Sequence, residues 1–254
     1  MTVKILVLAV NDRTTWMLSN AIEEVYPDTE VLLLSRQSKT SIFFSRLKNN
    51  GFLNATGQLL FILFSKFLLS KKNEYIASLI KNAKLSDTNL NNIKTKNFIS
   101  QNDSKLIEYL KNYNPDIVVV NGTKILSKKI LNACDAEFIN LHCGITPAYR
   151  GVHGAYWALV HNDIENCGVT IHKVDSGIDT GFIYYQAKLK ISKLDNFHVY
   201  PYKQYILGVP LMLKAINDIS IDKACYLKNS LPSKLYQHPT IIKYLYSRLK
   251  FGIK

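Results

Sequence analysis

Short apolar runs alternate along the chain with segments in which apolar residues recur at helical spacing. Residues 4–10 and 117–120 are almost continuously Val, Ile and Leu, which is typical of strands covered on both faces of a parallel sheet. Residues 16–25 follow a helical spacing and lead to a second apolar strand at 30–34. This order predicts an α/β fold: a doubly wound, mostly parallel, Rossmann-like sheet with helices on both faces.

The middle of the chain repeats the pattern. Residues 103–113 have helical spacing, residues 168–174 form an apolar strand, and residues 182–191 alternate as a strand or hairpin arm would. We therefore expect a first domain over residues 1–195. Residues 196–254 are expected to form a short helical C-terminal extension of two or three helices.

Residues 38–100 break the alternation, and we interpret them as a helical insertion followed by a connector. The insertion contains an apolar stretch, Phe52–Leu69, which is interrupted by polar residues such as Gln58 and Lys66. A membrane-spanning helix needs about 20 apolar residues, so we expect a buried or surface-associated helix. Three roles remain open for the insertion: capping the core, binding a substrate, or pairing two subunits as a homodimer.

The charge balance points to an anionic partner. The formal net charge is +13 and the isoelectric point is about 9.4, which suits nucleic acid, a membrane surface or a phosphorylated small molecule. The alternative is that a Lys- and Asn-rich composition has no functional meaning. The basic, amphipathic segment 239–251 could rest on an anionic membrane or be a solvated helix packed by its apolar side.

The cysteines and the amino terminus suggest an intracellular protein. Cys134, Cys143, Cys167 and Cys225 show no paired spacing, so no metal site is expected and reduced thiols are the default. The first apolar run is too short for a secretory signal. We therefore expect a cytoplasmic protein.

The most informative stretch is residues 138–181. Asn140 and His142 are two residues apart at the end of an apolar run, so on a strand their side chains leave the same face. Pro147 and Gly151 then turn the chain, and a loop at 175–181 contains two aspartates and two glycines.

These residues resemble the folate-dependent formyltransferase family, whose members include glycinamide ribonucleotide formyltransferase, methionyl-tRNA formyltransferase and N-formyltransferases acting on nucleotide-linked amino sugars. The resemblance covers roughly residues 114–190. It implies that 10-formyltetrahydrofolate is the co-substrate and that Asn140, His142 and Asp179 are catalytic. The residue types suit the chemistry: an amide N–H and an imidazole can stabilise an oxyanion, and a carboxylate can orient the imidazole and relay a proton.

The resemblance also implies a folate-binding set. Residues 121–127 resemble the segment that closes over the pterin through its backbone, although a simple strand-to-helix turn with Ser127 as N-cap would look the same. The acidic loop is expected to line the same pocket. The expected folate-binding residues are Gly122, Thr123, Lys124, Ile125, Leu126, Val174, Asp175 and Gly177.

An aromatic and basic cluster follows the catalytic strand. Tyr149, Arg150, His153 and Trp157 combine side chains suited to stacking on a base or sugar and to clasping phosphate. We expect them to bind the acceptor substrate, with the alternative that Trp157 belongs to the core because it has helical spacing with Val160.

The acceptor is inferred by elimination. The loop after the first strand, residues 11–15, has no glycine, unlike the phosphate loop of the glycinamide ribonucleotide enzyme. The last sixty residues are too few for the tRNA-binding barrel of the methionyl-tRNA enzyme. We expect an N-formyltransferase for a nucleotide-linked amino sugar of a surface polysaccharide such as lipopolysaccharide O-antigen, with no nucleic-acid partner favoured. The alternatives are a methionyl-tRNA formyltransferase-like enzyme, a formyltetrahydrofolate hydrolase, and a catalytically silent folate- or nucleotide-binding protein.

Overall fold

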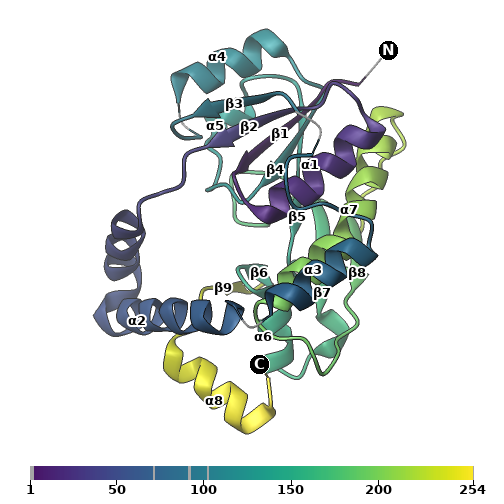
Figure 1. Ribbon diagram of the computed structural model, residues 1–254. Coiled ribbons are helices and arrows are strands. Elements are labelled where there is room, and N and C mark those ends of the chain that lie inside the picture. Colours follow the sequence, from purple (N-terminus) through teal and green to yellow (C-terminus); the bar gives the residue numbers. More distant parts are fainter. Residues whose placement is uncertain (1–2, 71, 91–92, 102, 254) are drawn as a thin grey trace.

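The structure is a computed structural model that describes residues 3–70, 72–90, 93–101 and 103–253. Its centre is a seven-stranded sheet (Figure 1). In spatial order the strands are β3 (Thr95–Phe98), β2 (Glu30–Leu34), β1 (Ile5–Val10), β4 (Ile117–Asn121), β5 (Glu137–His142), β7 (Gly168–Lys173) and β8 (Ile183–Lys188). The first five run parallel, whereas β7 and β8 each pair antiparallel with the preceding strand.

Helices cover both faces of this sheet. The described helices are α1 (Arg13–Val25), α2 (Lys39–Ser70), α3 (Asn73–Asn82), α4 (Ser104–Tyr113), α5 (Lys128–Leu131), α6 (Gly154–Val160), α7 (Val199–Ser220), α8 (Ile241–Phe251) and the 3-10 turn η1 (Ile164–Asn166). Two further short strands, β6 (Arg150–Gly151) and β9 (Leu235–Tyr236), pair with each other. The expected doubly wound, mostly parallel α/β fold is confirmed.

The period-two alternation of the strands explains how both faces are buried. In β1, Val7 packs with residues of α1 and α7, whereas Leu6 and Leu8 pack on the opposite face with residues of α4 and α5. A strand whose two faces are both covered must be apolar at every position. This is why the central strands were visible in the sequence.

Strand β5 carries the same alternation to the edge of the core. Ile139 and Leu141 belong to the α1–α7 side of the core, and Phe138 belongs to the α4–α5 side. Asn140 and His142 therefore share the face of Phe138 but lie beyond it, at the carboxyl end of the strand. Polar side chains are thus placed where the apolar core ends.

Helix α7 is part of the main core. Val209, Met212 and Ile216 are fully buried against β5 and β7, although the sequence assigned this helix to a C-terminal extension. The division after residue 195 stays a prediction, but α7 completes the layer that also contains α1.

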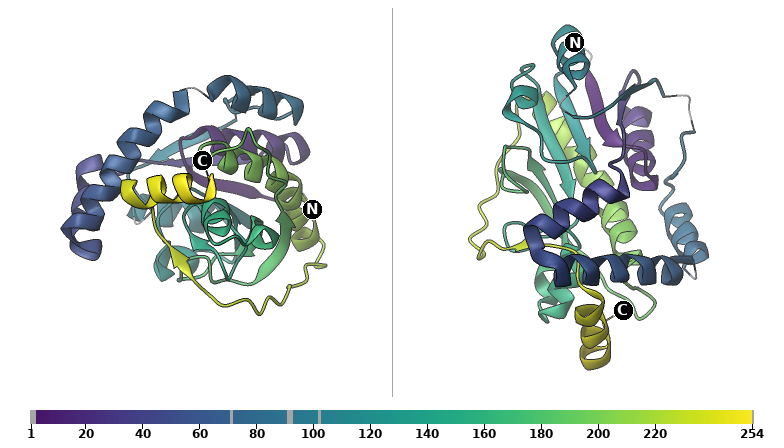
Figure 2. Two further views of the ribbon diagram at one scale, coloured as in Figure 1. Left: turned by 90° about the horizontal axis from the view of Figure 1, so that it is seen from below. Right: turned by 90° about the vertical axis from the view of Figure 1, so that its left-hand side faces the viewer.

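The region 38–100 contains more than helices. The expected helices are α2 and α3, but the connector that follows them also contains strand β3, which extends the parallel sheet beside β2 and was not expected. The long helix α2 bends at Gly51, which has a positive φ of 77°, and its second half packs with α8 over α6. Figure 2 shows α2 and α8 together at one end of the molecule.

No helix among the described residues is long and apolar enough to cross a membrane. The apolar stretch 52–69 instead has one buried side. Phe61 lies in a third core cluster, where its ring contacts Phe197 and Tyr244. This agrees with the buried or surface-associated helix that the sequence predicted.

Candidate active site

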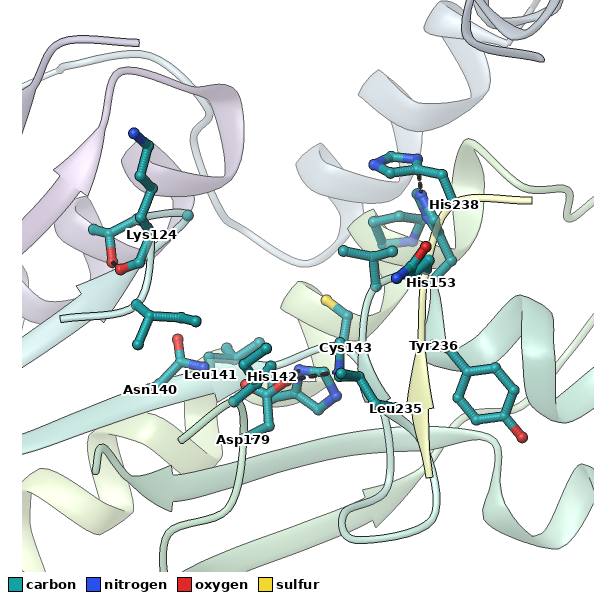
Figure 3. Close-up of a pocket in the computed structure, with 18 of the residues that line it drawn as sticks. Lys124, Asn140, Leu141, His142, Cys143, His153, Asp179, Leu235, Tyr236 and His238 are labelled. Carbon is teal, nitrogen blue, oxygen red and sulfur yellow. Dashed lines mark hydrogen bonds and ion pairs between the residues drawn. The ribbon is translucent and has the colours of Figure 1, made fainter. Parts of the chain in front are cut away.

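Asn140, His142 and Asp179 come together at the carboxyl end of β5 (Figure 3). His142 Nδ1 lies 3.3 Å from one carboxylate oxygen of Asp179. Asp179 comes from the loop after β7 and has a positive φ of 51°, a conformation that aspartate tolerates better than most residues. The sequence-predicted trio is therefore assembled in one place.

His172 joins the trio from the neighbouring strand. It is the cross-strand partner of Asn140 in the β5–β7 pair, and its Nε2 lies 3.2 Å from the Asn140 amide nitrogen and 3.5 Å from Asp179. Its Nδ1 is 2.6 Å from the carbonyl of Lys173. Nδ1–H therefore donates to that carbonyl, and Nε2 faces both the Asn140 amide and the Asp179 carboxylate. The Asn140 amide has two N–H groups, of which at most one is directed at His172, so one is left for a ligand.

The backbone also holds the carboxylate of Asp179. Gly151 N–H donates to Asp179 Oδ2 at 2.8 Å, and Arg150 Nη1 donates to the carbonyl of Ile178 at 3.0 Å. Arg150 thereby fixes the loop residue directly before the carboxylate. In the same loop, Asp175 accepts from Gly177 N–H and from the Thr180 hydroxyl.

The charges of the trio follow from burial and contacts. Burial raises the pKa of Asp179, but His142, His172 and the Gly151 N–H outweigh it and hold that pKa at about 2. Burial lowers the pKa of His142 below its ordinary value, and Asp179 and the Tyr149 carbonyl offset only part of the effect. At neutral pH the site therefore contains an ionised Asp179 beside a largely neutral His142.

The surroundings of His142 prepare it to take a proton. Its Nε2 is 2.7 Å from the Tyr149 carbonyl, and its Nδ1 faces the Asp179 carboxylate. A neutral imidazole has one N–H and can donate to only one of these two oxygens, whereas an imidazolium donates to both. A proton gained during a reaction would thus be stabilised on both sides of the ring.

The close approach of Tyr149 to His142 depends on Gly144. A Cβ atom at Gly144 would lie 2.3 Å from the Tyr149 carbonyl oxygen and 2.7 Å from His142 Nε2. Gly154 has a similar role, because a Cβ there would meet the backbone of residues 143 and 144 at 2.5 Å. Both glycines were missed in the sequence, since nothing in the local pattern shows which backbone segments will touch.

The trio lies in the wall of a cavity of about 710 Å³. This volume is in the range of small-molecule sites. In Figure 3 the trio lies between Lys124 on one side and the pair His153 and His238 on the other. The cavity therefore extends from the trio in two directions.

The expected folate-binding residues all line this cavity. The two segments 122–126 and 174–177 approach from the carboxyl ends of β4 and β7. The members of the set that line it are Gly122, Thr123, Lys124, Ile125, Leu126, Val174, Asp175 and Gly177. The structure brings them together, and their role in binding folate stays a prediction.

The expected acceptor-binding residues are divided by the structure. His153 lines the cavity, with Nε2 2.9 Å from Nδ1 of His238. Tyr149 is buried, and its hydroxyl donates to Asp163. Trp157 is buried and donates to the Gln237 carbonyl. These two and Arg150 do not line this cavity, although Trp157 lines a neighbouring pocket together with Asn49 and His238. Their role in binding an acceptor stays a prediction.

Sequence reasoning missed the opposite wall of the cavity. Helix α2 contributes Arg46, Asn49 and Gln58, and the segment around β9 contributes Tyr236 and His238. Burial lowers the pKa of Arg46. Burial, with a smaller contribution from the Arg46 cation, lowers the pKa of His238 to about 4. No carboxylate among the described residues forms an ion pair with Arg46. Within the part of the chain that the structure describes, the Arg46 cation in the cavity wall therefore has no counter-ion.

Among the described residues, no cluster of three or more His, Cys, Asp or Glu side chains could hold a metal ion. Cys143 borders the cavity, but burial raises the pKa of its thiol to about 12. It is therefore a protonated side chain rather than a reactive thiolate.

The family model for formyl transferases matches residues 67–203, which is more than half of the chain. This chain belongs to the formyl transferase family. The matched region contains Asn140, His142, His172 and Asp179, so the part of the chain that builds the site is also the part that defines the family.

Curated relatives in this family are methionyl-tRNA formyltransferases. The one from Thermodesulfovibrio yellowstonii is 36% identical over 116 residues, which cover 45% of this chain and 37% of that protein. One from Prochlorococcus marinus is 32% identical over 173 residues, which cover 68% of this chain and 50% of that protein. The chain thus spans half or less of the length of these relatives.

Solved structures of family members share the fold at lower identity. An N-formyltransferase from Helicobacter canadensis, in complex with folinic acid and dTDP-3-aminofucose, superposes with a TM-score of 0.57 at 16% identity, covering 92% of this chain and 70% of that one. Phosphoribosylglycinamide formyltransferase from Streptococcus pneumoniae has a TM-score of 0.54 at 20% identity, covering 85% and 98%. At these identities the likeness establishes the fold alone.

Proposed function

We propose that this formyl transferase family member is an N-formyltransferase that moves a formyl group from 10-formyltetrahydrofolate to the amine of a nucleotide-linked amino sugar. The observation that carries the proposal is the position of Asn140, His142 and Asp179 in the wall of one cavity with two arms. One arm suits the folate and the other the acceptor.

The folate arm is formed by segments 122–126 and 174–177. These segments offer backbone groups and mostly small or apolar side chains, together with the charged Lys124 and Asp175. Such a lining suits a flat heterocycle that hydrogen-bonds to backbone. The structure of the Helicobacter canadensis relative contains folinic acid, a formylated folate. This relative supports the assignment of a folate to this chain.

The transfer step uses groups of this chain at stated atoms. The amine nitrogen attacks the formyl carbon, a C–N bond forms, and the carbonyl electron pair moves to the oxygen. The free N–H of Asn140 donates to that oxyanion. His142 takes the proton from the attacking nitrogen, and its two neighbouring acceptors stabilise the imidazolium. The bond to N10 of the folate then breaks, and N10 receives the proton.

The acceptor arm is formed by α2 and the β9 segment. Arg46 is a half-buried cation without a described counter-ion, and it lies among the neutral polar side chains of His153, His238, Asn49 and Gln58. A cation in such surroundings favours an anionic group of the ligand. The diphosphate of a nucleotide sugar would supply that group.

A second candidate is an enzyme that formylates methionyl-tRNA. The sequence relatives quoted above carry this name, and the net charge of +13 would suit tRNA. The two candidates share the transfer chemistry and differ in the acceptor. Salt dependence separates them, because several phosphate contacts make tRNA affinity fall steeply with ionic strength.

The experiment that tests the proposal is single-turnover formyl transfer with a panel of amino-sugar nucleotides and with methionyl-tRNA. We expect formylation of at least one amino-sugar nucleotide, and a loss of it in the Asn140→Ala variant. The matched control is Asn132→Ala, at the exposed residue that directly follows α5. Formylation of tRNA alone would support the second candidate. Release of formate without an acceptor would indicate a hydrolase, and the absence of any turnover would contradict an enzymatic role.

A further inference from the structure

Helices α2 and α8 expose an unusual concentration of large apolar side chains. On α2 the exposed set includes Phe52, Leu53, Leu60 and Leu63, and on α8 it includes Ile242, Leu245 and Leu249. Leu53 and Leu249 are 85% and 86% exposed. The two helices pack against each other at one end of the molecule (Figures 1 and 2), and we call their exposed apolar residues the α2–α8 patch.

The patch is ordered by helical geometry. On α8, Ile242, Leu245 and Leu249 are separated by three and four residues, so they form one stripe. The opposite side of the same helix buries Tyr244 against Phe61. Helix α8 therefore has an inner apolar side that holds it to the protein and an outer apolar side that faces solvent.

The same arrangement occurs in the second half of α2. Leu60 and Leu63 lie on the outer side, at 50% and 57% exposure, whereas Phe61 and Ser65 are buried on the inner side. The inner side already accounts for folding and for the cavity wall. Folding gives no reason for the outer residues to be leucine and phenylalanine, because polar residues there would cost nothing in the core.

The charges of the two helices select the partner. Neither α2 nor α8 contains Asp or Glu, and both contain several Lys and Arg residues. Lys48, Lys66 and Lys250 are exposed. A twofold interface between copies of this chain would place these cations opposite like charges, whereas an anionic surface would neutralise them.

We propose that the α2–α8 patch docks the protein on an anionic lipid surface. Basic residues would contact the headgroups, and the outer Leu, Ile and Phe side chains would enter the headgroup–acyl boundary, as amphipathic helices do. The protein would lie on the membrane without crossing it. This inference does not depend on the formyl-transfer proposal.

Vesicle flotation tests the docking. The full chain is mixed with vesicles of phosphatidylcholine alone or of phosphatidylcholine with phosphatidylglycerol. We expect flotation with the anionic vesicles only, and loss of it when the salt rises from about 0.1 M to about 1 M, where the Debye length falls from about 10 Å to about 3 Å. Equal binding to both vesicles, or binding to neither, would overturn the proposal.

Lysine variants test the charge contribution. The double substitution Lys66→Gln with Lys250→Gln should weaken binding to anionic vesicles by about fivefold per residue. The matched control is Lys105→Gln with Lys129→Gln, two exposed lysines on α4 and α5, which should bind as the unmodified chain does. A similar loss in both double variants would mean that net charge alone drives binding and would contradict the patch.

Leucine variants test the apolar contribution. Leu63→Ser with Leu249→Ser should lower vesicle binding at least about tenfold while formyl transfer in solution is unchanged. Ile164→Ser with Leu194→Ser, at 55% and 58% exposure elsewhere on the surface, is the control and should bind normally. Light scattering completes the test: a dimer that the leucine variants dissociate would assign the patch to a second copy and overturn the lipid assignment.

Discussion

The substitution Gly144→Ala should displace the His142 side chain without changing its chemical identity, so it tests how far activity depends on the position of the ring. The new methyl carbon would lie 2.3 Å from the Tyr149 carbonyl oxygen. Real Cβ atoms essentially never come closer than 3.0 Å to another heavy atom. The neighbour is backbone, so it cannot rotate away as a flexible side chain would. The carbonyl has to move by roughly 0.7 Å to reach 3.0 Å, and the hydrogen bond that holds His142 at 2.7 Å moves with it.

The expected effect is a loss of rate. A misplacement of about 1 Å in an active site can cost on the order of 10²-fold, so a shift of this size should lower kcat by about 10- to 10²-fold. Overpacking should also cost about 1–3 kcal/mol of unfolding free energy. The assays are steady-state formyl transfer for kcat and KM, and urea unfolding for stability. KM for both substrates should change little, because Gly144 does not line the cavity.

The pH profile distinguishes a positioning effect from general damage. The Tyr149 carbonyl raises the pKa of His142, so its displacement should lower that pKa further. Since the neutral ring is the form that accepts a proton, the acid limb of the kcat profile should move to lower pH. Gly252→Ala, at a position with φ of 68° and nothing within 4 Å, is the control: it should cost about 1–2 kcal/mol of stability and leave the profile unchanged. A folded Gly144→Ala variant with unaltered kcat and pH profile would refute the reasoning.

Three further predictions concern the charged and polar side chains of the site. Asn140→Ala should lower kcat by about 10²–10³-fold with little change in KM, as expected for a lost oxyanion donor. Arg46→Gln should raise KM for the acceptor at least about tenfold and leave KM for the folate unchanged, whereas Lys48→Gln on the same helix should change neither. Ionised Asp179 should contribute about 2 kcal/mol of stability above pH 3.8, because its folded pKa is about 2. Urea unfolding should show that this contribution fades as the pH falls from 3.8 to about 2. The Asp179→Asn variant should lack this pH dependence, whereas Glu108→Gln should keep it.

The elements that the sequence predicted share one property: their burial produces a recognisable pattern of apolar residues within one continuous segment. Strands β1 and β4 are buried on both faces, so each reads as an unbroken apolar run. The pair Asn140 and His142 could be placed on one face because a strand has a period of two. The loop at 175–181 stands out by its glycines and aspartates, and the resemblance to the family identified Asp179, rather than Asp175, as the catalytic carboxylate.

The parts that the sequence did not predict depend on contacts between distant segments. Strand β3 is an edge strand with almost entirely exposed side chains, so its residues show neither an apolar run nor an alternation. His153 and His238 are 85 residues apart and meet only because β9 pairs with β6. Tyr149 and Trp157 have the composition of a binding cluster, but the packing of α6 turns both into the core.

Helix α2 connects the two proposals, because its first half, before the bend at Gly51, lines the cavity with Arg46, and its second half carries the exposed Leu63 and Lys66. If both proposals hold, the acceptor arm of the cavity opens beside a surface held against anionic lipid. The two functions of the helix can nevertheless be separated. Arg46→Gln should raise KM for the acceptor and change vesicle binding by no more than about fivefold, the effect expected for one cation. Leu63→Ser should weaken vesicle binding and leave KM for the acceptor unchanged. A variant in either half that impaired both functions equally would mean that α2 had moved as a whole, and the assignment of its two halves to two ligands would fail.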